Sequence, residues 1–119
     1  MADDNSRTTD FLLAQLIDAL RLVALPPDRQ VAILPSFVHP QDEVMTLYAD
    51  AFLGVPQLRA AGAVSADLEP MLVELDQLLD GNLTSEQWDA SRRLAATALA
   101  LLGVTPDDPD FNGVTWVQG

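Results

Sequence analysis

The chain has 119 residues, among them 18 acidic residues, six arginines, no lysine and no cysteine, and its formal net charge is −12. This length suits one domain spanning residues 1–119, and the 49% apolar content is enough for a hydrophobic core. The missing cysteines exclude disulfides and a zinc–thiolate site, and the low number of basic residues argues against nucleic-acid binding.

The N-terminal sequence predicts a short flexible segment, residues 1–8, followed by an amphipathic helix. Polar residues 8–10 are candidate N-caps, and Pro26-Pro27 prevents the helix from continuing beyond about Leu25. Apolar residues recur at spacings of three and four: Leu13, Leu16, Ile17, Leu20 and Val23. The segment lacks a basic leader, and no apolar run approaches the ~20 residues that span a bilayer. We therefore expect a cytoplasmic protein without a membrane partner.

Two further helices are predicted before the middle of the chain. Pro27 can begin a short helix that covers Asp28 to Leu34. A longer helix is expected from Pro40 to Leu53, with one more turn at 57–61. On a helical wheel of this longer helix, one face is apolar: Val44, Met45, Leu47, Tyr48, Ala51 and Phe52. The opposite face is polar: Asp42, Glu43, Thr46 and Asp50.

The second half of the chain predicts two more helices with well-defined ends. Ser65 or Asp67 caps the first, and Gly81 suits a left-handed C-cap. The pattern Thr84-Ser85-Glu86-Gln87 is a capping box for the second, which ends at Leu102. From 94 to 102 this last helix is apolar on nearly every side. That pattern is typical of the buried centre of a bundle and, less often, of an oligomer interface.

These elements predict an all-α fold, a compact four- to five-helix bundle with a non-helical tail at residues 104–119. Prolines, Asn112 and Gly113 exclude a helix in the tail, and residues 114–117 can form a short extended segment. Phe111 and Trp116 are expected to cover the end of the bundle, with anchoring of a partner as the alternative.

No residue pattern in the chain indicates catalysis, and we expect no catalytic residue, cofactor or metal ligand. His39, the single histidine, lacks a recognisable nucleophile nearby and is expected to precede a helix. The carboxylate pairs Asp42-Glu43, Asp76/Asp80 and Asp107-Asp108 fall on predicted polar faces or loops, where solvated surface charge is the simpler interpretation.

The tail sequence Asp108-Pro109-Asp110-Phe111-Asn112-Gly113 matches the opening of a calcium-binding loop. The twelfth position of that loop is Gly119, where a bidentate glutamate is required. An ordinary turn explains the same residues, so we favour a turn over a calcium site.

The acidic surface is the remaining functional signal. Two consecutive predicted helices carry eight of the 18 acidic residues: Asp42, Glu43, Asp50, Asp67, Glu69, Glu74, Asp76 and Asp80. Such charge keeps a protein soluble, but −12 exceeds what a small domain usually needs for solubility. Clustered carboxylates would also steer a basic protein onto this surface.

The run LPSFVHPQDEVMTLYADAFLGVPQLRAAGAVSADLEPMLVELDQLLD, residues 34–80, has an "LPxF…DE…DAF…PQL…G" layout. In this layout it resembles the small acidic immunity-type proteins that bacteria encode with polymorphic or contact-dependent toxins. The resemblance covers about 40% of the chain. It implies a stoichiometric inhibitor that binds one cognate toxin through acidic residues, with Asp42, Glu43 and Asp50 in that role.

The sequence thus favours a non-enzymatic, acidic protein-binding module with a basic protein partner, most plausibly a nuclease-like toxin domain. The residues expected at that interface are Asp42, Glu43, Asp50, Glu69, Asp76, Asp80 and Trp116. The alternative is a homo-oligomeric structural or adaptor protein that assembles through its last, apolar helix. A small enzyme is the third and least favoured interpretation.

Overall fold

Prolines, caps and glycines divide the chain into helices close to the positions that the sequence predicts. The computed structural model describes residues 2–105 and 107–109, with side chains from residue 7 onward. The described residues form six helices and no strand: α1 (Ala2–Ala24), α2 (Pro27–Ile33), α3 (Pro40–Phe52), α4 (Val55–Ala60), α5 (Glu69–Leu78) and α6 (Ser85–Leu101). The predicted all-α class is confirmed.

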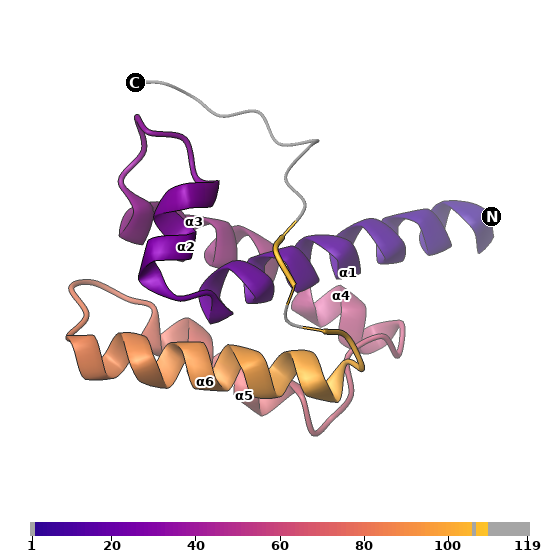
Figure 1. Ribbon diagram of the computed structural model, residues 1–119. Helices are drawn as coiled ribbons and strands as arrows, with labels where there is room; N and C mark the ends of the chain where they lie inside the picture. The colour runs from indigo at the N-terminus through magenta and orange to yellow at the C-terminus, as the bar shows by residue number, and fades with distance from the viewer. Residues whose placement is uncertain (1, 106, 110–119) are drawn as a thin grey trace.

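The four longer helices form a bundle in which each packs against two of the others. α1 lies between α3 and α6, while α5 closes the ring by packing against the same two helices. Figure 1 shows α1 and α6 running antiparallel at the front, with α3 and α5 behind them. The short helix α4 also packs against α1. Within the described part of the chain, no helix is both long and apolar enough to cross a bilayer.

The core is built around the second half of α1. Leucine and valine side chains of this helix are fully buried, and the other longer helices contribute their predicted apolar faces. The largest fully buried side chains are Tyr48, Leu16, Leu20, Leu22, Leu58, Leu68, Leu72, Leu75, Leu99, Val23, Val44 and Val64. Two polar groups reach into this core and find acceptors there. Gln30 Nε2 donates to the Leu22 carbonyl at 2.9 Å, and the Tyr48 hydroxyl donates to the Leu72 carbonyl at 2.7 Å.

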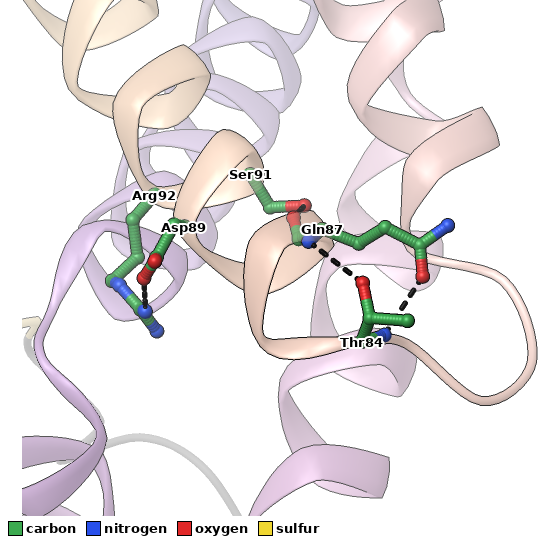
Figure 2. Close-up of polar contacts among 5 residues, drawn as sticks. All are labelled: Thr84, Gln87, Asp89, Ser91 and Arg92. Carbon is green, nitrogen blue, oxygen red and sulfur yellow. Dashed lines mark hydrogen bonds and ion pairs between the residues drawn. The ribbon is translucent and has the colours of Figure 1, made fainter.

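The start of α6 is fixed by the predicted capping box (Figure 2). The Gln87 amide donates to Thr84 Oγ1 at 3.2 Å, and the Thr84 amide donates to Gln87 Oε1 at 2.7 Å. At the other end, Gly103 has a φ of +75°, and the Val104 amide donates back to the Leu99 carbonyl at 3.1 Å. Glycine is favoured here because a side chain strains this left-handed conformation.

The segment before α5 and the loop after it follow the predicted punctuation only in part. Neither Ser65 nor Asp67 is the N-cap of α5, which is Leu68, and the C-cap is Leu79, two residues before Gly81. Ser65 Oγ accepts the Leu68 amide at 3.1 Å, so Ser65 caps the turn that leads into the helix, whose regular part begins only at Glu69. Gly81 has a φ of +73°, the left-handed conformation predicted for this position.

Three further expectations from the sequence differ from the structure. The first helix begins at Ala2 and not near residue 8. The segment expected to be a flexible N-terminus, residues 1–8, is therefore helical from its second residue. The turn expected at 57–61 is a separate helix, α4, which raises the number of helices above the predicted four or five.

The third difference concerns the apolar end of α6, which is not the buried centre of the bundle. Leu99 and Ala98 are buried, whereas Ala96, Thr97 and Ala100 are exposed and Leu101 is 52% exposed. The central position belongs to α1, which packs against α3, α4 and α6. A helix without charged residues can be buried on all sides. Whether it is buried in this way depends on how many other helices pack around it.

The chain after α6 crosses α1 as an irregular segment (Figure 1). Arg21 Nε donates to the Thr105 carbonyl at 3.0 Å, and Arg29 forms an ion pair with Asp108 at 2.5 Å. Residues 104–109 are therefore non-helical, as predicted, except that Pro106 is not described. The expectations for Phe111, for Trp116 and for an extended segment at 114–117 lie outside the described residues.

Candidate partner-binding surface

The net negative charge of this protein is unevenly distributed along the chain. Residues 40–80, which include α3, α4 and α5, contain eight acidic residues and a single arginine, Arg59. α6, by contrast, contains two acidic residues and two arginines. The exposed surface of α3 and α5 is thus the strongly negative part of the described molecule, and it holds six of the predicted partner-binding residues.

Three of these residues form the α3 acidic strip, Asp42, Glu43 and Asp50. Asp42 and Asp50 are exposed and Glu43 is half-buried. Because each residue turns an α-helix by 100°, the three side chains point within about 100° of one another. Asp42 lies 3.6 Å from Nδ1 of His39, which precedes the first residue of α3 as predicted. No basic residue occurs in α3 itself, so the strip has no cation from its own helix.

The other three residues form the α5 acidic edge, Glu69, Asp76 and Asp80. Glu69 and Asp76 are separated by seven residues, about two helical turns, and so lie on the same side of α5. Glu69 Oε1 lies 3.4 Å from Arg59 Nε, while Asp80 is exposed just beyond the end of the helix. The edge is therefore only partly neutralised, by one arginine at its N-terminal end.

Tyr48 shows which way the α5 acidic edge faces. The pKa of Tyr48 is raised well above its ordinary value, mainly because its hydroxyl is buried and also because the negative charge of Asp76 is nearby. Since Tyr48 lies on α3 and bonds to Leu72 of α5, Asp76 must point toward the junction of the two helices. Asp76, and with it Glu69 two turns earlier, consequently lies on the side of α5 that borders α3.

Between the two acidic groups lies a band of uncharged residues that we name the α3 apolar strip: Met45, Ala49 and Phe52. Their spacing of four and three residues aligns them on one side of α3. At 100° per residue, their side chains point in directions between those of Tyr48 and Asp42. Met45 and Phe52 are half-buried and Ala49 is exposed. The Phe52 ring stacks on Tyr48 with centroids 6.1 Å apart, which fixes its orientation.

The structure therefore does not gather the six acidic residues into one cleft. It places them in two groups on either side of an uncharged strip. Sequence reasoning assigned Met45 and Phe52 to the core face and did not consider Ala49. The signal that could have revealed the strip is the 4–3 spacing at the border of the polar face.

The remaining candidate residues have local partners or lie outside the described chain. Asp107 accepts a hydrogen bond from the Thr105 hydroxyl, and Asp108 is paired with Arg29. Of the segment that matches the opening of a calcium loop, only Asp108 and Pro109 are described, and Asp108 is paired with the Arg29 guanidinium. Within the described residues no group of three potential ligands is placed to hold a metal ion.

The arginines on the rest of the molecule do not form a basic patch. Arg92 pairs with Asp89 one turn earlier on α6 (Figure 2), and Arg21 and Arg29 hold the segment after α6. The negative half of the bundle thus faces solvent without a matching positive surface among the described residues. Comparison of the chain with family models, curated proteins and solved structures found no match.

Proposed function

We propose that this chain is a non-enzymatic, cytoplasmic protein-binding module that uses its negative α3–α5 surface to mask a basic protein. The observation that carries the proposal is the α3 apolar strip, which is flanked on both sides by acidic residues. Carboxylates on the rim steer and orient a basic partner, and uncharged residues between them provide surface that can be desolvated.

The partner that best fits is the basic domain of a nuclease-like bacterial toxin. Such a domain must expose lysines and arginines to hold a phosphate backbone, so an acidic protein that covers them blocks substrate access without any chemistry. The resemblance of residues 34–80 to immunity-type proteins supports the same choice.

Charge reversal of the α3 acidic strip tests the surface. Immobilised protein first captures partners from a bacterial lysate at low and at high salt, and the basic protein released by salt is purified. The triple variant Asp42→Arg, Glu43→Arg, Asp50→Arg is then expected to bind it roughly tenfold or more weakly and with a flatter salt dependence, since each exposed pair contributes roughly 0.2–1 kcal/mol.

A matched control keeps the change in net charge constant. Asp10→Arg, Asp28→Arg and Glu86→Arg reverse three exposed acidic residues elsewhere, two of them in first helical turns like Asp42 and Glu43. This triple variant should bind as the wild type does. Equal weakening in both triple variants would mean that only overall charge matters and would contradict the proposed surface.

The apolar strip has its own test. Ala49→Glu makes the surface more negative, so electrostatic attraction alone predicts tighter binding of a basic partner. Docking onto the strip predicts weaker binding, because a charged side chain then occupies the centre of the contact. Ala32→Glu, at an exposed position on α2, is the control. Tighter binding of the Ala49 variant would exclude the strip from the interface.

A further inference from the structure

A second surface, on the other side of α5, has no role in the proposed function. α5 and α6 are separated there by a shallow, open depression with a volume of about 260 Å³. It is lined by Glu74, Leu78, Ala90, Arg93, Leu94 and Thr97. None of these residues belongs to the acidic groups described above.

The depression continues along α6 as an uncharged helix face. Ala90, Leu94, Thr97 and Leu101 follow one another at spacings of four, three and four residues, which is the spacing of a helix-pairing seam. Leu101 is 52% exposed at the end of the seam, and no charged residue occurs between Leu94 and Thr105. Ala90 and Leu94 are half-buried, and Thr97 and Leu101 are exposed.

Two opposite charges border the depression from opposite helices. Glu74 projects from α5 and Arg93 from α6, and neither has an ion pair to the other in the described structure. A surface with one positive and one negative group across a groove is complementary to itself. A two-fold axis through the groove brings Arg93 of each molecule against Glu74 of the other.

We propose that the α5–α6 face binds a second copy of this chain and forms a symmetric dimer. Like charges oppose the association of two chains that each carry −12, so a self-contact is favoured where local charge is balanced. The two charged residues that line the depression, Glu74 and Arg93, balance each other, whereas α3 carries three acidic residues and no basic one. The dimer leaves the α3 surface free and does not depend on the proposed function.

Sedimentation velocity of the purified chain across the micromolar range tests the dimer. The wild type is expected to shift from monomer to dimer with concentration. Glu74→Arg and Arg93→Glu should each raise the dissociation constant roughly tenfold, and the double exchange should restore it, as expected for a close charge pair. A wild type that remains monomeric throughout would overturn the proposal.

The change in net charge distinguishes a specific Glu74–Arg93 pair from general electrostatic repulsion between two negatively charged chains. Glu74→Arg reduces the net negative charge of the chain from −12 to −10 and should strengthen association if repulsion alone is decisive. The specific pair predicts the opposite. Stronger association of this variant, or a double exchange that fails to restore the wild-type constant, would overturn the pairing and with it the proposed geometry.

A second pair of variants locates the interface without relying on charge exchange. Leu101→Asp places a carboxylate on the exposed end of the seam and should abolish the dimer. Val31→Asp changes a side chain that is 59% exposed on α2 and should leave it intact. Both positions are exposed, so both variants are expected to fold. Equal effects of the two substitutions would show that the α5–α6 face is not the interface.

Discussion

The hydroxyl of Tyr48 on α3 donates a hydrogen bond of 2.7 Å to the backbone carbonyl of Leu72 on α5. Tyr48 is 1% exposed and Leu72 is fully buried, so the bond crosses the core. It joins α3 and α5, each of which carries three acidic residues and no basic residue, and it lies at the border between the α3 apolar strip and the α5 acidic edge. Removing this single oxygen thus tests how the negative surface is held.

Tyr48→Phe should lower the free energy of unfolding by about 1 kcal/mol, the usual net contribution of one hydrogen bond between neutral groups. The ring itself remains, so its stacking on Phe52 and its packing are retained. Urea unfolding followed by circular dichroism measures the change. An unchanged midpoint would show that water replaces the hydroxyl without cost.

Stability at alkaline pH should depend on the same residue. The raised pKa means that the folded protein holds the phenolic proton more tightly than the unfolded chain does. Below pH about 10 both states keep the proton and the stabilisation is complete. Above that pH the unfolded chain loses its proton first, so the free energy of unfolding falls as the pH rises toward the pKa of the folded state.

This pH window is free of other titrating side chains, because the chain has one tyrosine, no lysine and no cysteine. Urea unfolding at a series of pH values between about 9 and 11 should therefore show a decline in the wild type that Tyr48→Phe removes. Tyrosinate absorbance of the folded wild type should rise only above the ordinary range. A normal tyrosine titration in the folded protein would contradict the burial of this hydroxyl.

The capping box at α6 provides a second prediction. Thr84→Ala removes the acceptor of the Gln87 amide and should reduce the free energy of unfolding by about 1 kcal/mol. Thr97→Ala is the matched control, since this exposed threonine lies inside α6 and its hydroxyl only bonds back to the Arg93 carbonyl. Alanine is the better helix former there, so the control should be neutral or slightly stabilising. Thermal unfolding compares the two variants directly.

The ion pair between Arg29 and Asp108 should contribute little and only at low salt. Both side chains are about half exposed. Exposed ion pairs of this kind contribute roughly 0.2–1 kcal/mol to the free energy of unfolding. A double-mutant cycle with Arg29→Ala and Asp108→Ala should give a coupling energy in that range that disappears at high ionic strength. A coupling that persists at high salt would indicate that the segment after α6 is held more firmly than this exposed pair allows.

The helices themselves were largely predictable because their limits are set locally. Proline removes an amide donor, a threonine side chain replaces a missing backbone partner at Thr84, and glycine accepts the left-handed conformation at Gly81 and Gly103. Each effect acts within about one turn, so the sequence alone reveals it. The early start of α1 at Ala2 was missed because a good cap at residues 8–10 does not prevent a helix from beginning sooner.

The tertiary structure decided which helix occupies the centre and how the charges are distributed around it. The second half of α6 is uncharged and almost uniformly apolar, yet α1 is central because α3, α4 and α6 all pack against it. The separation of the acidic residues into two groups around Met45, Ala49 and Phe52 likewise depends on how α3 is rotated against α5. Periodicity gives the face of one helix that turns inward, but the choice of neighbour comes from packing between segments distant in the chain.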